Sequence, residues 1–306
     1  MGRYLVKRLL MGVVTLFVLA TITFFMMHAI PSSPFTGEVS KLPPAIQEAL
    51  VDYYQLNEPL HVQYVKYLKN ALRGDFGTSL SHNGRSVTDI IKLGVGNSAS
   101  LGAVAFCIAI GLGVFLGTVA AFTKHRWVNN VVAFVATLGA SVPSFLLALL
   151  LMMIFGVTLR WLPIVGLTSW RHYILPGFAL ALAPIAMISR LTKTSLVEVM
   201  KQDYMVLAKS KGTAQIKIIT RHALRNAMIP VVTYAGPLLA TLLTGSFVIE
   251  TLFSVPGIGA EFVSSVTNRD YTMILALTIY YGTFVIICNI ATDLITAALD
   301  PRIRMR

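Results

Sequence analysis

The residues that most readily bind metals or attack substrates, the histidines and cysteines, are scattered along this chain. The six histidines form no pair at metal-ligand spacing, and Cys107 and Cys288 sit in separate apolar runs. No HExxH, GxSxG or phosphate-binding GxxxxGK[ST] motif occurs, and no carboxylate pair lies within an apolar stretch. We therefore expect no metal site, no cofactor, no catalytic residue and no ATP hydrolysis by the phosphate-loop route.

One acidic residue stands inside a hydrophobic run. Asp293 falls in the inner half of the last apolar stretch, where a charge is costly and is by default a functional candidate. The simpler explanation is a pair with a basic residue of the cytoplasmic loops, and we favour it. Glu250 lies at the outer end of the fifth apolar stretch and is expected simply to face water.

The composition indicates a membrane protein. The 306 residues are 56% hydrophobic and only 12% charged, and the mean hydropathy is +0.73. About 25% of residues are charged in a typical soluble domain, so these values exclude a disordered chain, a disulfide scaffold and an ordinary soluble enzyme. The net charge of +12 fits the Lys/Arg bias of cytoplasmic segments, and we expect no nucleic-acid partner.

Six apolar stretches are each about long enough to cross ~30 Å of hydrocarbon as a helix. The predicted fold is therefore all-α, with six transmembrane helices. Lys and Arg are concentrated in the segments that face the cytoplasm if both termini are cytoplasmic, which sets the predicted orientation. The predicted spans are Leu9–Ile30, Ser98–Phe122, Val131–Phe155, Tyr173–Leu191, Met228–Glu250 and Met273–Leu299.

Three parts follow from these spans. Residues 1–30 form the first transmembrane helix, and residues 31–97 form an extracytoplasmic segment with two helical runs of its own, which begin after Pro43 and Pro59. This segment is either a lid on the other spans or a dock for an external partner. Residues 98–306 form a five-helix core that includes a cytoplasmic loop, 192–226.

Glycine and proline interrupt the third, fourth and fifth spans at Gly139, Pro143, Pro184 and Gly236-Pro237. Such breaks kink helices and are tolerated where the backbone is buried or lines a wet cavity. A pathway between the helices is therefore plausible, although these residues are also common in ordinary membrane helices. Small polar residues are candidates for its lining: Ser141, Thr241, Thr244, Ser246 and Asn289.

The basic cytoplasmic loop has helix punctuation. Asp203 is a plausible N-cap for a short helix over Tyr204–Lys211, and Gly212 suits its left-handed end. Thr213 can cap a second, amphipathic helix. Attraction to anionic lipid headgroups would need charge but no capped helix, so the pattern favours a protein partner.

At this point the residues resemble a family. Asp203-Tyr-Met-Val-Leu-Ala-Lys-Ser-Lys-Gly212, followed by Arg221-His-Ala-Leu-Arg-Asn-Ala-Met-Ile-Pro230, is similar to the signature loop of binding-protein-dependent ABC importer permeases. The dipeptide, oligopeptide and nickel branch is the most similar, and within it the B-type subunit of oligopeptide permeases. Further matches are Gly74-Asp-Phe-Gly-Thr-Ser79, Glu250-Thr-Leu-Phe-Ser-Val-Pro-Gly-Ile-Gly259 and Leu299-Asp-Pro-Arg302. The usual Glu-Ala-Ala of the wider family is Val206-Leu207-Ala208 here.

The resemblance implies a type I ABC importer permease in the cytoplasmic (inner) membrane of a prokaryote, without enzymatic activity of its own. It implies import of oligopeptides driven by two cytoplasmic ATPase subunits, with a second homologous permease subunit, an extracytoplasmic substrate-binding protein and membrane lipid as partners. A homodimer remains an alternative to the second permease. The implied ATPase-coupling residues are Asp203, Tyr204, Ala208, Lys209, Lys211 and Gly212.

Three other functions stay open. A permease for nickel or a metal chelate would look much the same, although bare metal is disfavoured by the lack of ligand clusters. A passive channel would leave the capped loop unexplained. A membrane-embedded enzyme would need a nucleophile–base or metal constellation.

Overall fold

The computed structural model describes residues 2–29, 43–53, 57–82, 84–214 and 217–299. Within these ranges the regular elements are helices, and the only β-pairing is an isolated antiparallel bridge between Thr78 and Ser86. The helices are α1 (Gly2–His28), α2 (Pro44–Tyr53), α3 (Leu60–Ala71), α4 (Val87–Phe122), α5 (Arg126–Ser141), α6 (Ser144–Leu151), the π-helical η2 (Met152–Thr158), the 3-10 turn η3 (Trp170–Tyr173), α7 (Ile174–Val199), α8 (Asp203–Ser210), the π-helical η4 (Ile218–Ala223), α10 (Leu224–Ala227), α11 (Ile229–Leu243), α12 (Phe247–Leu252), α13 (Ile258–Asn268) and α14 (Tyr271–Leu299).

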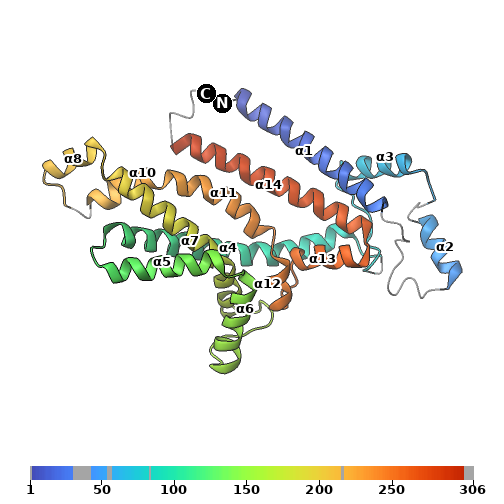
Figure 1. The fold of residues 1–306 in the computed structure, drawn as a ribbon. Coiled ribbons are helices and arrows are strands. Elements are labelled where there is room, and N and C mark those ends of the chain that lie inside the picture. The colour runs from blue at the N-terminus through green and yellow to red at the C-terminus, as the bar shows by residue number, and fades with distance from the viewer. Residues whose placement is uncertain (1, 30–42, 54–56, 83, 215–216, 300–306) are drawn as a thin grey trace.

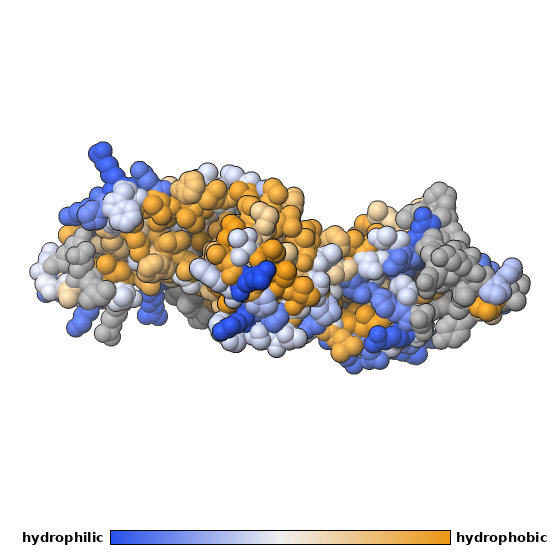
Figure 2. Space-filling view, turned by 90° about the horizontal axis from the view of Figure 1, so that it is seen from below, coloured by the Kyte–Doolittle hydropathy of each residue, from blue (hydrophilic) through white to orange (hydrophobic). Residues whose placement is uncertain are grey.

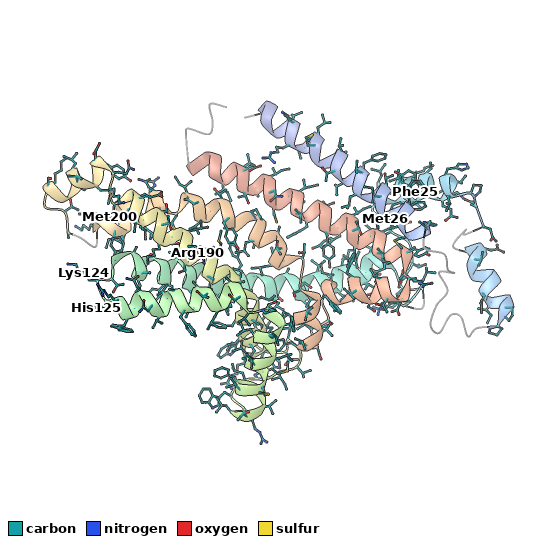
Figure 3. All side chains as sticks on the ribbon, in the orientation of Figure 1. Phe25, Met26, Lys124, His125, Arg190 and Met200 are labelled. Carbon is teal, nitrogen blue, oxygen red and sulfur yellow. The ribbon has the colours of Figure 1, made fainter. Side chains whose placement is uncertain are left out.

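The long helices run side by side and give the molecule an elongated shape (Figure 1). Helix α8 lies at one end, and α2 and α3 lie at the other, while α6 projects sideways from the middle. Figure 3 places Lys124, His125 and Met200 toward the α8 end and Phe25 and Met26 toward the α3 end. Hydrophobic residues cover much of the surface over the long helices, and hydrophilic residues gather toward the ends (Figure 2).

Four helical segments are long and apolar enough to cross a membrane: Val6–His28, Val87–Phe122, Trp170–Val199 and Tyr271–Ile295. Two bent pairs raise the number of spans to six if each pair is one span. The first joins α5 to α6 and η2, and the second joins the Ile218–Ala227 segment to α11. The described residues thus agree with the predicted all-α membrane fold.

Helices α4 and α7 form the centre of the bundle. Ala105 and Ala109 of α4 are fully buried beside Ile185 and Ile188 of α7. Gly113 brings the α4 backbone against Ile188, because the absence of a side chain lets two helices approach closely. The small residues on this face of α4 therefore form a packing surface.

The remaining spans pack outward from this pair. Helix α5 lies on α7, α11 lies against α4 and α14, and α1 is attached along α14. Near the C-terminal end of α1, Phe24 packs against Tyr64 and Tyr67 of α3, with Tyr271 in the same buried cluster. The predicted helical segment beyond the first span therefore exists and closes over one end of α1 and α14.

Helix α4 is longer than the predicted second span, Ser98–Phe122. Helix α4 begins at Val87 and continues without a break through Ser98. At Gly94 the α4 backbone packs directly on Ile258. The second span and the end of the preceding segment are one helix.

The third and fifth predicted spans also need correction. The chain bends by 112° between α5 and α6, where Val142 and Pro143 adopt extended backbone. Helix α11 ends at Leu243, and Gly245 at φ +86° separates it from α12. Of the residues that were read as kinks in these two spans, only Pro143 lies at a break, whereas Gly139 lies inside α5 and Gly236-Pro237 lies inside α11. In the fourth span, Pro184 lies inside α7 without ending it.

Candidate functional site

Helix α8 is attached to the bundle by a buried methionine and a side-chain hydrogen bond. Among the α8 side chains that the structure describes, Met205 alone is fully buried, and it packs with Leu196 of α7 and with Ile218, Ala223 and Ala227. The Asn226 side-chain amide donates a hydrogen bond to the Tyr204 hydroxyl over 2.8 Å. The short helix is thus tied to the ends of α7, η4 and α10.

The opposite face of α8 is open. Val206 and Leu207 are each 56% exposed, and Tyr204 is 41% exposed. The other side of α8 is fixed by the packing of Met205, so these two adjacent exposed aliphatic side chains form a surface suited to a protein partner. We call Tyr204, Val206 and Leu207 the α8 face.

The predicted coupling residues surround this face. The helix begins at Asp203, so the cap position falls one residue earlier than expected, and Gly212 has the predicted left-handed backbone at φ +71°. Asp203, Lys211 and Gly212 are exposed, and Ala208 is half-buried against the Met205 cluster. The Lys209 side chain lies outside the described residues. Met205 and Asn226 were missed, although Met205 and Ala208 at i and i+3 mark a buried face.

The predicted pathway residues lie at or near the helix breaks, apart from one. Ser141 is exposed at the α5–α6 bend, and Thr241, Thr244 and Ser246 surround the break between α11 and α12. Thr241 and Thr244 both donate to backbone carbonyls of their own helix. Asn289 is half-buried on α14. The structure thus gathers three of the five around one break.

Asp293 has a partner on another span. Its carboxylate lies 2.9 Å from a guanidinium nitrogen of Arg8, and the two side chains are 30% and 48% exposed. The pairing confirms that a basic residue neutralises this charge, but the residue belongs to α1 and not to a cytoplasmic loop. The pair connects α1 to α14 near the α8 end.

Glu250 is buried, which overturns the expectation that it faces water. It is 0% exposed, its Oε1 accepts a hydrogen bond from the Ser98 hydroxyl over 2.7 Å, and its Oε2 accepts one from the Ala260 N–H over 2.9 Å. Ser98 in turn accepts the Ile258 N–H. The carboxylate therefore links α12, α4 and the start of α13. Sequence reasoning missed it because α12 was read as the end of a span.

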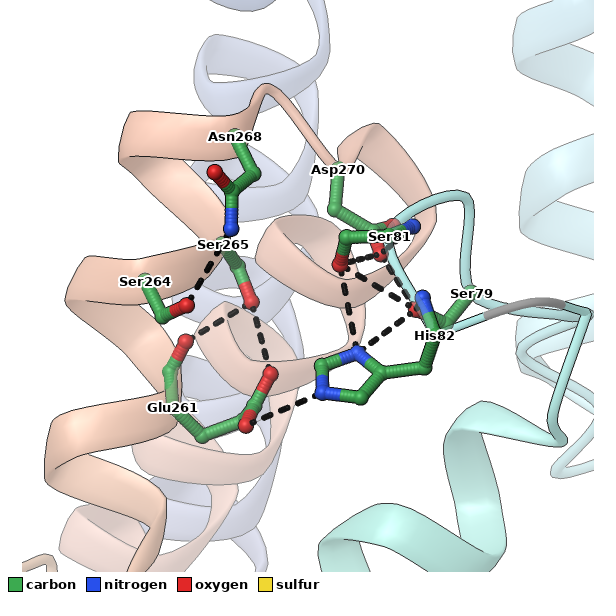
Figure 4. Close-up of polar contacts among 8 residues, drawn as sticks. All are labelled: Ser79, Ser81, His82, Glu261, Ser264, Ser265, Asn268 and Asp270. Atoms are coloured by element: carbon green, nitrogen blue, oxygen red, sulfur yellow. Dashed lines mark hydrogen bonds and ion pairs between the residues drawn. The ribbon is translucent and has the colours of Figure 1, made fainter. Parts of the chain in front are cut away.

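A second buried carboxylate joins the chain between α3 and α4 to the start of α14. Asp270 is 0% exposed and accepts hydrogen bonds from the Ser79 hydroxyl and from the Ser81 hydroxyl and N–H (Figure 4). His82 lies between this group and Glu261, with its Nε2 3.7 Å from the Glu261 carboxylate. Although serine, histidine and aspartate meet here, Ser79 is fully buried and donates to Asp270, so it is not placed to attack a substrate.

Burial opposes ionisation of Asp270, but the hydrogen bonds from Ser79, Ser81 and the Met273 N–H outweigh it and hold its pKa below the usual 3.8. A carboxylate with a lowered folded-state pKa stabilises the fold above its unfolded pKa, and this stability is lost as the pH falls through the folded pKa. We expect the thermal midpoint of the purified protein in detergent to fall below about pH 4.

Asp270→Asn should remove the pH-dependent stability that this carboxylate contributes. An amide nitrogen in place of Oδ2 is itself a donor and would face the donors of Ser79 and Ser81. The variant should be less stable at pH 7, and the difference from wild type should shrink as the pH is lowered toward 3. Melting both proteins across this range isolates Asp270 from the other carboxylates. A difference that stays constant with pH would contradict the assignment.

Metal ligands do not gather in the described part of the chain. No group of three or more His, Cys, Asp or Glu side chains that could hold an ion occurs there. Cys107 is exposed and Cys288 is buried, and both are free thiols.

The sequence matches known transport-system proteins over nearly its whole length. A family model described as "Binding-protein-dependent transport system inner membrane component" matches residues 113–305, and the model of the corresponding N-terminal region matches residues 1–86. The dipeptide transport system permease protein DppB of Bacillus subtilis (strain 168) is 44% identical over 305 residues, which cover 100% of this chain and 99% of the relative. The oligopeptide transport system permease protein OppB of Salmonella typhimurium (strain LT2) is 43% identical, with 99% and 100% coverage.

Solved structures show the same fold. An inward-facing crystal form of the MetNI methionine ABC transporter matches with a TM-score of 0.56 at 17% identity, and covers 69% of this chain and 96% of that one. An amino acid ABC transporter crystallised with histidines matches with a TM-score of 0.54 at 15% identity, with 69% and 94% coverage. The fold is that of a type I ABC importer permease. The chain belongs to the family of binding-protein-dependent transport system inner membrane components, and it is a multi-pass inner membrane protein.

Proposed function

We propose that this chain is a transmembrane subunit through which an ABC importer moves peptides into the cell, and that its α8 face docks on a separate ATPase subunit. Relatives 43–44% identical over the full chain are named as dipeptide and oligopeptide permeases. ATP is bound and hydrolysed by the partner, because the sequence has no phosphate-binding loop.

The observation that carries the coupling role is the two-sided build of α8. Met205 fixes one side in a buried cluster that includes the ends of α7 and α10, while Val206 and Leu207 stay open on the other. A push on the open side is therefore passed to spanning helices through packed atoms, since buried side chains cannot yield without repacking. Asp203 and Lys211, both exposed, complete the contact with charge, and Lys209 joins them on the basis of the sequence alone.

The substrate path, in this proposal, runs along the exposed face of α11. Pro230, Thr233, Pro237 and Thr241 are exposed at helical spacing, and Thr244 follows at the break. Ser141, Ser246 and Asn289 belong to the same path. Hydroxyl groups that donate to carbonyls of their own helix can still accept hydrogen bonds from backbone N–H groups of a peptide. Such contacts do not depend on the side chains of the peptide.

The remaining partners follow from this arrangement. A second permease subunit completes the path, and two ATPase subunits act on the cytoplasmic side, where α8 and both termini are placed. The 31–97 segment faces outward and receives an external substrate-binding protein, and residues 98–306 form the core with its coupling loop. A metal chelate is the alternative cargo, but no feature of the described residues favours it over peptide.

Co-purification tests the proposal directly. The tagged chain, extracted from its native membrane in mild detergent, should bring down ATPase subunits and a second permease. Vesicles that contain the purified complex and the binding protein should accumulate labelled peptide only with ATP. ATP-independent flux would favour a channel, and a chain that purifies alone would remove the importer assignment.

Two α8 variants separate docking from folding. Leu207→Asp changes an exposed position, so the protein should fold normally but lose ATPase co-purification, with uptake reduced roughly tenfold or more, the size of a lost interface anchor. Met205→Ala leaves the α8 face intact and opens a cavity behind it. It should keep the ATPase bound and lower the peptide imported per ATP hydrolysed, and Met205→Leu should restore coupling. Unchanged uptake in Leu207→Asp would contradict docking at this face.

A further inference from the structure

Two cations lie on an exposed face of the central helix α7. Arg190 and Lys193 are both exposed, and a spacing of three residues places them on the same side of the helix. The predicted fourth span ends at Leu191, but α7 continues to Val199. Both cations therefore belong to a helix that is long and apolar enough to cross the membrane. The same exposed face carries Ala183, Met187 and Thr194.

The neighbouring helices determine where this face opens. Helix α4 covers the opposite side of α7 at Ile188. On one flank α5 packs with Gly139 against Ala186, and on the other Leu191 joins the buried cluster that contains Val231 of α11. The exposed face of α7 therefore opens between α5 and α11, next to the exposed face of α11 along which the proposed substrate path runs.

Arg190 lies at membrane depth. It follows Ile174, the first residue of α7, by 16 residues or about 24 Å, and hydrocarbon is ~30 Å thick. The helix continues for nine more residues, about 14 Å, before it ends at Val199. Figure 3 places Arg190 along α7 between Met200 and the middle of the molecule. A cation at this depth is costly and is by default a functional candidate.

No carboxylate neutralises the two cations. In the described part of the chain, no ion pair involves Arg190 or Lys193. The Lys193 ammonium donates a hydrogen bond to the side-chain oxygen of Asn129 on α5 over 3.2 Å, which fixes its position but leaves its charge uncompensated. The next acidic residue along α7 is Glu198, about 12 Å beyond Arg190. Because like charges one turn apart repel each other, the pair is suited to an anion from outside the chain.

The position of the pair restricts the source of this anion. A lipid phosphate would reach it from the outer surface of the bundle, but α7 is central: 56% of its most apolar part is buried, against 17–33% in the other three unbroken spans. An ATPase docked on the α8 face lies beyond the end of α7. An anion that travels between α5 and α11 meets both cations directly.

We propose that Arg190 binds the C-terminal carboxylate of a peptide on the substrate path, with Lys193 as a second cation beside it. This inference rests on the proposed function, because it takes peptide as the cargo. A linear peptide ends in a carboxylate whatever its sequence, and a guanidinium binds a carboxylate through two parallel hydrogen bonds. The site therefore recognises the end that peptides share and does not select their side chains.

Paired peptides test the inference in vesicles that contain the reconstituted importer. One peptide ends in a free carboxylate and the other, of the same sequence, ends in an amide. Each is supplied with saturating binding protein, so that loading does not limit uptake. The wild type should import the acid about tenfold faster than the amide, which is the effect of one charge-assisted hydrogen bond. Arg190→Gln should abolish this preference, and Arg190→Lys should retain part of it.

A matched pair of lysine variants provides the control. Lys193→Gln should reduce the preference for the free acid. Lys92→Gln makes the same change at an exposed position near the start of α4, so it should leave the preference intact.

Photocross-linking of the wild-type importer makes the test independent of how the variants fold. A peptide with a benzophenone amino acid as its C-terminal residue and a free carboxylate should label α7 close to Arg190 during turnover, as mapped by mass spectrometry. The same peptide with the probe at its N-terminal residue should label other positions. Excess unlabelled free-acid peptide should suppress the α7 adduct more strongly than the amide does.

The outcomes separate this inference from the proposed function. Equal import of acid and amide by the wild type, or a ratio that Arg190→Gln leaves unchanged, would overturn the carboxylate site while peptide import stands. Adducts of the C-terminal probe that avoid α7 would overturn it as well. If the wild type imports neither peptide with ATP, the proposed function fails, and the inference fails with it.

Discussion

Replacing Glu250 with alanine should destabilise the protein by about 3 kcal/mol, through loss of hydrogen bonds in a buried site. The carboxylate accepts from Ser98 and from the Ala260 N–H, and none of it is exposed to water. Removing it leaves both donors buried without an acceptor and opens a cavity between α4, α12 and α13. The unfolding midpoint in detergent should fall clearly, and uptake should fall with it.

Two controls distinguish hydrogen bonding from packing. Glu250→Gln keeps the side-chain volume. Its amide oxygen can accept from the Ala260 N–H and its amide nitrogen can donate to Ser98, so we expect this variant to lose only about 1 kcal/mol of stability. Ser98→Ala in the Glu250→Ala background removes one stranded donor, so the double variant should be more stable than the sum of the single effects predicts. Equal losses for Ala and Gln, with additive double effects, would contradict the hydrogen-bonded site.

The buried Glu250 carboxylate explains why glycine is frequent in the chain around it. A Cβ atom at Gly245 or Gly257 would collide with the Glu250 carboxylate, and one at Gly259 would lie 3.0 Å from its Oε2. In the sequence these residues indicate only turns. The reason for them is tertiary, because the backbone must close around a side chain supplied by α12.

The number and order of the long helices could be predicted from the sequence because hydrocarbon imposes a minimum apolar length. The short helix α8 could also be predicted, since Gly212 marks its end locally. The bend after α5 could not, because Pro143 inside an apolar run is compatible with both a kink and a right-angled turn. The start of α4 was misplaced for a related reason, since its first residues, Val87 to Asn97, are stabilised by contacts with α13 and α14 and not by their own hydropathy.

In the candidate site, too, local features could be predicted from the sequence and tertiary contacts could not. The left-handed backbone of Gly212 is a local feature and was predicted, whereas the cap expected at Asp203 lies one residue earlier. Met205, Asn226 and the Ser98–Glu250 pair depend on which distant helices meet. Asp293 was found because a charge is rare in an apolar run, but its partner Arg8 is distant in sequence. Buried partners of this kind are set by tertiary packing, which a single sequence does not display.

Helix α4 offers a second test with a large expected effect and an internal control. Gly102 faces the α11 backbone, where a Cβ atom would lie 2.6 Å from the Leu242 carbonyl carbon and 2.9 Å from the Leu243 Cα. Backbone atoms cannot move aside by changing rotamer as a side chain can. Gly102→Ala must therefore increase the distance between α4 and α11. We expect a loss of about 3 kcal/mol, at the upper end of the cost of overpacking a core.

Gly111, on the same helix, has no atom within 4 Å of the corresponding position and is exposed. Gly111→Ala should therefore raise stability by about 0.5–1 kcal/mol, because alanine loses less conformational freedom in a helix than glycine does. The two variants make the same chemical change and should move the unfolding midpoint in opposite directions. Since α11 also carries the proposed path, Gly102→Ala should reduce ATP-dependent uptake while Gly111→Ala leaves it unchanged. Equal midpoints for the two variants would show that α4 and α11 are not packed backbone to backbone.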